Sequence, residues 1–307
     1  MTALISIVMP CFNAEKHLPT SISSLMAQTQ GDWELIAVDD GSVDGTLNWL
    51  QAQTDPRIRV ITQQNAGVSA ARNAGLAACS GQYVAFLDAD DTWAPRFLEA
   101  TLNALHTQPD RVLAYCGWQN LGIEGARGDP FVPPDYEGPG KTLALLGGCR
   151  WPIHACLTRR EAIEAAGRFD TRLKIGEDYL LWMEVAARGA IVRVPEVLAY
   201  YHHHGVAQAT GNRVLAATDT LKAKQIFLEH HPEVERTIGR EKIEELTWGA
   251  LIRQGSELYW RGDIVSARPL LRKALLGGHA QSKDWMRMLP CLLPLPLHRL
   301  VMKVRTK

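Results

Sequence analysis

Strand-like and helix-like segments alternate through the first third of the chain, and this alternation constrains the fold more than any other feature. Short apolar and β-branched runs occupy residues 4–9, 33–38, 58–62 and 83–87. Between them, apolar residues recur at helical spacing, as at Leu18, Ile22 and Leu25. This repetition predicts an α/β fold in which a mostly parallel sheet is flanked by helices.

Acidic residues follow two of these runs directly. Asp39 and Asp40 end the second run, and Asp88-Ala89-Asp90-Asp91 follows the fourth. Ligands of open α/β sheets bind beyond the carboxyl ends of the strands, so both acidic groups are expected beside one ligand. Asp88 and Asp90 are two residues apart and can face the same way, and their oxygens suit Mg²⁺ or Mn²⁺ bound together with substrate phosphates. The alternatives are local: an Asx-turn at Asp39-Asp40, and capping of the next helix by Asp91 or Thr92.

A single arginine stands near the start of the helix predicted for residues 67–78. This residue, Arg72, follows Asn65-Ala66-Gly67 by one helical turn and can reach a phosphate or a base. The alternative is that Arg72 is simply solvated, as surface arginines usually are.

The 307 residues suffice for one large α/β domain and a smaller appendage. Helical patterns replace the alternation near residue 212, which predicts a domain over 1–210 and a helical region over 211–307. Residues 122–140 are rich in Gly, Pro and charge, and are expected to form a loop over the ligand site. Basic and acidic residues number 33 each, so no nucleic-acid partner is expected.

Apolar stretches of about 18 residues or more are absent from the sequence, so no transmembrane helix is expected. The start has no basic secretory-signal segment, and six scattered cysteines suit reduced thiols in the cytoplasm. In residues 289–307, leucine and proline alternate before a basic end. This segment is expected either to contact the inner face of a membrane peripherally, as an amphipathic helix, or to pack on the protein with a solvated basic end.

Four sequence blocks resemble those of family 2 glycosyltransferases, which have the GT-A fold. The blocks are SIVMPCFN (6–13), VDDGSVDGT (38–46), NAGVSAARN (65–73) and GQYVAFLDADD (81–91). They occur in the family's order with similar gaps, and the resemblance extends over residues 4–205. It implies a GT-A fold, a nucleotide-sugar donor, and a glycan, lipid-linked or protein acceptor.

The resemblance implies roles for residues of the donor pocket. In the family, an aspartate of the second block contacts the uracil of a UDP-sugar, and position assigns this role to Asp40, with Asp39 nearby. Pro10 and Phe12 would line the nucleotide pocket, although tyrosine is common in place of Phe12.

The same resemblance implies a metal site. Asp88 would contact the ribose, and Asp90 would coordinate Mn²⁺ or Mg²⁺ at the diphosphate. Family members often carry Tyr-Arg-x-His near the end of the domain, and here Tyr201-His202-His203-His204 occupies that place. His204 therefore matches the histidine that lies near the diphosphate or metal, and the alternative is a polar surface.

The family places its catalytic base in a Glu-Asp pair at a helix start, which here is Glu177-Asp178. A helix N-terminus favours the charged form of Asp178, and a charged carboxylate can take a proton from an acceptor hydroxyl. The alternative is ordinary charge complementarity at a helix N-terminus. Trp151 and His154 are expected to line the acceptor site, by similarity of location alone.

Together these features predict a metal-dependent, inverting glycosyltransferase of cell-surface polysaccharide or glycan synthesis. It is expected to add one sugar at a time, because the sequence lacks the Gln-x-x-Arg-Trp motif of processive members. The alternatives are a non-catalytic scaffold subunit that binds nucleotide sugars and a retaining transferase. A nucleotidyltransferase is disfavoured, because no Gly-rich loop bearing Lys or Arg follows the first strand.

Overall fold

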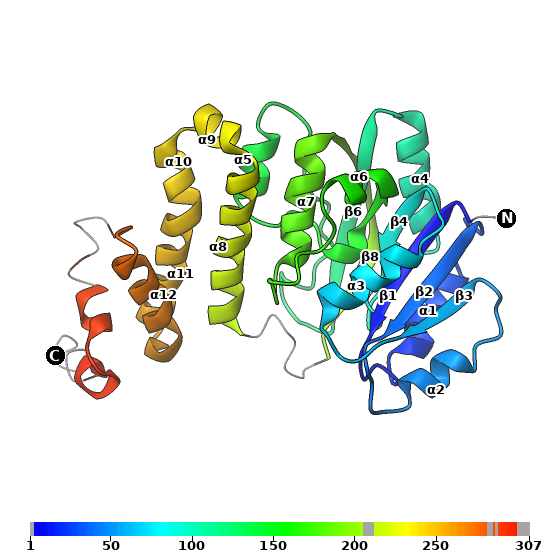
Figure 1. Ribbon diagram of the computed structural model, residues 1–307, viewed down its shortest axis with the longest axis horizontal. Coiled ribbons are helices and arrows are strands. Elements are labelled where there is room, and N and C mark those ends of the chain that lie inside the picture. Colours follow the sequence, from blue (N-terminus) through cyan, green and yellow to red (C-terminus); the bar gives the residue numbers. More distant parts are fainter. Residues whose placement is uncertain (1–2, 205–211, 281–284, 286–287, 300–307) are drawn as a thin grey trace. The chain divides into compact units, whose positions relative to one another are not determined.

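The computed structural model describes residues 3–204, 212–280, 285 and 288–299. The chain forms two compact units, Met1–Ala207 and Gln208–Lys307. The first contains an eight-stranded sheet with helices on both faces, and the second is helical (Figure 1). The predicted α/β fold with a helical C-terminal region is confirmed.

The sheet consists of β1 (Ile5–Cys11), β2 (Trp33–Asp39), β3 (Ile58–Thr62), β4 (Tyr83–Phe86), β5 (Thr92–Trp93), β6 (Arg111–Leu121), β7 (Cys156–Arg159) and β8 (Ala190–His202). Its order is β3-β2-β1-β4-β7-β6-β8-β5. The first four strands in this order are parallel, whereas β7 is antiparallel to both neighbours and separates them from the parallel pair β6 and β8. Ile5, Ile7 and Val8 of β1 are fully buried, as expected for a central parallel strand.

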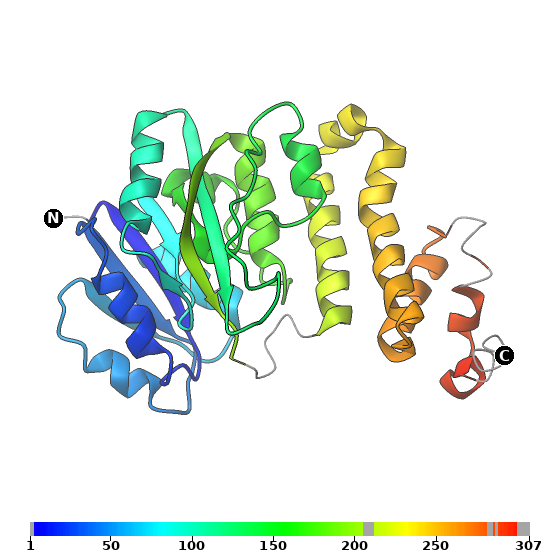
Figure 2. The same cartoon turned by 180° about the vertical axis from the view of Figure 1, so that it is seen from behind.

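Helices cover both faces of this sheet. They are α1 (Leu18–Met26), α2 (Thr46–Gln51), α3 (Val68–Ala78), α4 (Phe97–Thr107), α5 (Lys141–Leu146), α6 (Arg160–Ala165) and α7 (Glu177–Arg188). Figure 1 shows α3, α6 and α7 on the near face, and Figure 2 shows α1 and α4 on the other. The helical crossovers between parallel strands bring the carboxyl ends of β1, β2 and β4 to one edge of the sheet.

Close packing of α3 against the sheet fixes the position of its first turns. Gly75 lies so near β1 that a Cβ atom there would stand 2.4 Å from Val8 Cγ1. Asn73 ties the helix to the chain before α7, since it donates to Phe169 O at 2.8 Å and accepts from Phe169 N at 3.0 Å. Arg72 is thereby held between the strand ends and the start of α7.

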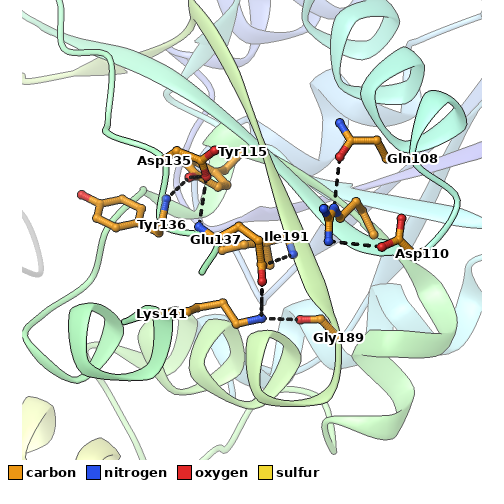
Figure 3. Close-up of polar contacts among 10 residues, drawn as sticks. Gln108, Asp110, Tyr115, Asp135, Tyr136, Glu137, Lys141, Gly189 and Ile191 are labelled. Atoms are coloured by element: carbon orange, nitrogen blue, oxygen red, sulfur yellow. Dashed lines mark hydrogen bonds and ion pairs between the residues drawn. The ribbon is translucent and has the colours of Figure 1, made fainter. Parts of the chain in front are cut away.

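The segment after β6 was expected to cover the ligand site, but much of it lies elsewhere. Residues 131–141 return along β6 to the amino-terminal end of β8. There Glu137 Oε2 accepts from Ile191 N at 2.7 Å and from Lys141 Nζ at 3.1 Å, and Lys141 also donates to Gly189 O (Figure 3). These bonds hold the segment at the sheet edge opposite the strand ends that carry the acidic residues.

The second unit is built from α8 (Arg213–His230), α9 (Pro232–Ile238), α10 (Arg240–Glu244), a π-helical turn (Glu245–Gly249), α11 (Ala250–Trp260) and α12 (Ile264–Leu276). α11 and α12 form a hairpin in which Gly255 allows Leu270 and Leu271 to approach closely. None of the helices in the described ranges is both long enough and apolar enough to span a bilayer.

The segment 289–307, for which either a membrane-surface helix or packing on the protein is expected, lies partly outside the described residues, which end at 299. Within the described part, His298 is buried, and its Nδ1 lies 3.2 Å from Arg268 Nη1. Leu292 and Leu297 are 40% and 50% exposed. The described part of this segment therefore packs on the helical unit and also presents apolar surface.

Candidate functional site

The carboxyl ends of β1, β2 and β4 place the predicted strand-end residues together. Cys11 is paired with Asp39 across β1 and β2, and Val8 is paired with Phe86, two residues before Asp88. The residues gathered at this edge are Pro10, Phe12, Asp39, Asp40 and Asp88. Pro10 is half-buried and Phe12 is 52% exposed, so Phe12 offers an aromatic face to a ligand.

The two aspartates at the end of β2 differ in their surroundings. Asp40 accepts from the backbone N of Ala66 and of Gly67, each at 2.9 Å, and from Gln63 Nε2 at 2.7 Å. Its carboxylate therefore holds the loop before α3. Asp39 Oδ1 is buried and has no hydrogen-bond partner among the residues described. Asp39 is therefore better able than Asp40 to accept a hydrogen bond from a ligand, although position alone suggested Asp40.

Arg72 connects the strand ends to the start of α7. Its side chain is 4% exposed, Nη2 donates to Asp88 Oδ1 at 2.8 Å, and Nη1 donates to Glu177 Oε1 at 2.5 Å. The solvated alternative is therefore wrong. A contact of Arg72 with a phosphate or base stays a prediction; in the described chain the guanidinium pairs with two carboxylates, and only Nε lacks a partner.

Asp178 follows Glu177 in the first turn of α7. Burial raises the pKa of Asp178 to about 7, and the neighbouring Glu177 carboxylate also raises it, whereas Arg72 opposes the shift. The expectation of a carboxyl that favours its charged form is therefore corrected in direction, because burial and the Glu177 carboxylate outweigh Arg72 and the Tyr179 N–H. A carboxyl with a pKa near 7 can take up and release a proton at neutral pH.

Asp90 and His204 come together from distant parts of the chain. His204 Nε2 lies 3.7 Å from Asp90 Oδ2, which is too long for a hydrogen bond, and no described residue accepts from it. Burial and the Asp88 carboxylate raise the pKa of Asp90. No group of three or more His, Cys, Asp and Glu side chains in the described ranges is arranged to hold a metal. A cation here would therefore have two protein ligands, completed by phosphate oxygens and water.

His17, just before α1, was not anticipated. Its ring packs against that of His204, tilted by 38° with 4.0 Å between centroids, and it lies near enough to Asp90 to lower the carboxyl's pKa. No sequence pattern links these positions, because the contact depends on where β8 ends.

Trp151 and His154 do not line an accessible acceptor site, contrary to the expectation from their location. Trp151 is 1% exposed and stacks on Tyr115. His154 is fully buried, and burial lowers its pKa to about 4. Both are interior side chains. Similarity of location along the sequence does not indicate how deeply a side chain is buried.

Asp91 is also interior. It does not cap the next helix, because α4 begins at Phe97 with Arg96 as its N-cap. Its Oδ2 lies 3.1 Å from His154 Nδ1, but the two atoms lack the angle of a hydrogen bond. Burial raises the pKa of Asp91 well above its usual value. A neutral imidazole therefore lies beside a carboxyl that resists ionisation.

Known proteins are similar to this chain in sequence or in fold. The family model described as Glycosyl transferase family 2 matches residues 6–130. The uncharacterized glycosyltransferase alr2836 of Nostoc sp. (strain PCC 7120 / SAG 25.82 / UTEX 2576) is 32% identical over 228 residues, 70% of this chain and 68% of that protein. The Escherichia coli UDP-Glc:alpha-D-GlcNAc-diphosphoundecaprenol beta-1,3-glucosyltransferase WfgD is 42% identical over 183 residues, 59% of this chain and 69% of that protein.

Two solved structures resemble the chain at low sequence identity. S. aureus TarS 1-349 in complex with UDP-GlcNAc has a TM-score of 0.59 at 17% identity, covering 91% of this chain and 92% of that one. Mannosyltransferase PcManGT from Pyrobaculum calidifontis, in complex with GDP-Man and Mn²⁺, has a TM-score of 0.60 at 16% identity, covering 100% and 80%. At these identities the likeness concerns the fold alone.

Proposed function

The chain belongs to glycosyltransferase family 2, and from this premise we propose that it transfers one sugar from a UDP-sugar to an acceptor hydroxyl, inverting the anomeric carbon with the help of a divalent metal. The observation that carries the proposal is the chain of contacts from Asp88 through Arg72 to Glu177. It joins the strand ends, where ligands of such sheets bind, to Asp178 with its pKa near 7. Such a carboxyl is suited to accept the proton of an attacking hydroxyl.

We assign the binding site of the nucleotide-sugar donor to the carboxyl ends of β1, β2 and β4. The unpartnered Oδ1 of Asp39 can accept from an N–H of the uracil, and Phe12 and Pro10 would line the base and ribose. Asp88 would accept from a ribose hydroxyl through the oxygen that Arg72 does not occupy. A uridine donor is supported by the UDP-GlcNAc complex of the S. aureus protein and by the UDP-Glc in the name of the E. coli relative.

Asp90 and His204 fit a divalent cation, Mn²⁺ or Mg²⁺. The Asp90 carboxylate is 40% exposed and faces His204 Nε2, which lacks a partner within the described structure. One or two carboxylates plus substrate phosphates are the usual setting for such ions. A bound cation would neutralise negative charge on the departing diphosphate. The Mn²⁺ complex of the similarly folded mannosyltransferase supports this assignment.

Asp178 acts as general base in a single displacement. The deprotonated carboxylate accepts the proton of the acceptor hydroxyl while the hydroxyl oxygen attacks the anomeric carbon opposite the leaving diphosphate, so the configuration inverts. Glu177 is a poorer candidate, because Arg72 holds its carboxylate in an ion pair. A retaining transferase would instead give a product with the donor's anomeric configuration, which NMR of the product distinguishes.

We assign the reaction to residues 1–210 and contacts with a larger acceptor or a membrane to the helical region 211–307. The name of the E. coli relative specifies a diphosphoundecaprenol acceptor, which supports a lipid-linked acceptor in cell-surface polysaccharide synthesis, with other glycans or a protein as alternatives. The exposed Leu292 and Leu297 are apolar surface of the kind that peripheral membrane proteins present. All six cysteines are free thiols, which supports work on the cytoplasmic side.

Calorimetric titration with a panel of nucleotide sugars tests this function. We expect a UDP-sugar to bind, and Mn²⁺ to tighten its binding by about tenfold or more. Asp90→Ala should abolish the gain from Mn²⁺ but leave metal-free binding within about twofold. Failure of every nucleotide sugar to bind would refute the donor assignment, and an undiminished Mn²⁺ effect in Asp90→Ala would refute the metal site.

Asp39→Asn should weaken UDP binding by about tenfold, because a neutral amide oxygen is a poorer acceptor than a carboxylate. Asp40→Asn is the matched control: it disturbs the loop at Ala66 and Gly67 and should chiefly lower the melting temperature. Calorimetry and thermal unfolding of both variants separate the two roles. If Asp40→Asn instead lost affinity at an unchanged melting temperature, the base contact would belong to Asp40.

A further inference from the structure

We propose that Asp91 is a positioning residue that fixes the register of the end of β8 and thereby sets His204 beside Asp90. The inference rests on the proposed metal role of Asp90 and His204. Asp91 is completely buried and cannot itself reach a ligand, so any part it has in the site must act through a neighbour. Burying a carboxyl is costly unless it is hydrogen-bonded, and its bonding partner is informative for that reason.

The ladder between β6 and β8 is interrupted, so the register before the interruption does not set the register after it. Cys116 pairs with Val194, but the next residue of β6, Gly117, pairs with Val197, so β8 bulges at Pro195 and Glu196, and the register shifts once more before Ala199. Beyond the bulge, a slip of one residue would turn every following side chain to the opposite face. His203 would then stand where His204 stands. Beyond the irregularity the ladder resumes from Trp118 and Ala199 to Leu121 and His202, and His203 N donates to Leu121 O at 2.8 Å, so β6 holds one edge of this end of β8. A side-chain contact on the other edge would hold the histidines to the same face.

Asp91 supplies that contact. Its Oδ1 accepts from His202 N at 3.0 Å, and this bond joins the acidic motif to the strand only two residues before His204. The adjacent Thr92 reinforces it, since Thr92 pairs with Tyr200 and its Oγ1 lies 2.9 Å from His202 Nε2. Because the strand β5 is only two residues long, these side-chain bonds provide much of its attachment to β8.

The side chains beyond this attachment have the orientation that it predicts. The rings of His202 and His204 are nearly parallel, 7° apart with centroids 6.1 Å from each other, as for residues on one face of an extended strand. The ring of His204 also packs at a tilt against that of His17, and its Nε2 faces Asp90 Oδ2. Asp90, which faces His204, and Asp91, whose bond positions His204, are thus adjacent residues of the Asp88-Ala89-Asp90-Asp91 motif.

Removing the bond between Asp91 and His202 N should lower the affinity for the metal without lowering the affinity for the nucleotide. We expect Asp91→Ala to lower the affinity for Mn²⁺ at saturating UDP by about tenfold, measured by electron paramagnetic resonance of free Mn²⁺. Affinity for UDP without metal should stay within about twofold. Asp91→Asn keeps an oxygen that accepts from His202 N and should restore Mn²⁺ affinity to within about threefold.

A double-mutant cycle separates positioning from general damage. If Asp91 acts through His204, then Asp91→Ala should have almost no further effect on Mn²⁺ affinity in a His204→Ala background. Thr92→Val, which removes one hydroxyl and keeps the shape, should give a smaller loss of about threefold and serves if Asp91→Ala does not fold. Thr101→Ala is the control for a buried polar deletion, since its hydroxyl bonds only within α4.

The outcomes are distinct. Unchanged Mn²⁺ affinity in folded Asp91→Ala, or in Thr92→Val where Asp91→Ala does not fold, would overturn the positioning role while leaving the proposed function intact. An equal loss with and without His204 would overturn it as well. A wild type that binds UDP but no Mn²⁺ would refute the metal site and this inference together.

Discussion

Asp178→Asn should lower kcat by about a thousandfold while nucleotide-sugar binding stays within about twofold of the wild type, because the amide cannot take the acceptor's proton. Asparagine keeps the shape of the side chain and can still accept from Tyr179 N, as Asp178 Oδ1 does at 2.7 Å. The loss should therefore fall on the chemical step. Steady-state assays of UDP release give kcat, and calorimetry gives the affinity for the donor.

Two outcomes would contradict this assignment. If the variant turned over at a near-normal rate, Asp178 would not be the base. If the wild type bound the donor but never transferred the sugar, the scaffold alternative would be favoured.

The pH profile checks the same assignment. The active form of Asp178 is deprotonated, and its pKa is raised to about 7, so kcat/KM should fall about tenfold per pH unit below that value and level off above it. Asp178→Asn should lack this limb. A limb that persists in the variant would belong to another group.

The stability of the fold should respond to pH in the corresponding direction. With a pKa raised from 3.8 to about 7, folded Asp178 holds its proton more tightly than the unfolded chain does. Its contribution to stability is therefore full below the lower value and is lost as the pH rises through this window.

Arg72→Ala should lower the free energy of unfolding by about 3 kcal/mol, because it leaves the carboxylates of Asp88 and Glu177 without their common counter-ion. Arg72 also opposes the raised pKa of Asp178, so the acid limb of the pH profile should move to higher pH in this variant. Urea denaturation measures the first effect, and kcat/KM against pH measures the second.

Arg57→Ala is the matched control for this change. Arg57 pairs with Asp55 at 2.7 Å, but its side chain is 34% exposed, so its removal should cost at most about 1 kcal/mol. If the two variants were equally stable, the ion pairs of Arg72 with Asp88 and Glu177 would contribute little to the stability of the fold. A stable Arg72→Ala protein with an unmoved acid limb would also separate Arg72 from the proton chemistry.

Local pattern was enough to predict the architecture and the edge of the sheet where the site lies. The alternating segments and the residues just beyond each strand are properties of neighbouring positions, so Asp39, Asp88 and Asp90 could be placed from the sequence. The crossover rule then brings the strand ends together without knowledge of any side-chain contact. The helical C-terminal region followed from periodicity in the same way.

Tertiary packing decided how these groups divide their work. Asp39 rather than Asp40 keeps a free oxygen, because the loop that follows the next strand, β3, folds back onto Asp40. Burial at the start of α7 reversed the expected sign of the Asp178 shift, and burial removed His154 from any accessible surface. Depth, desolvation and partners are set by segments that are far apart in the chain, so no local pattern contains them.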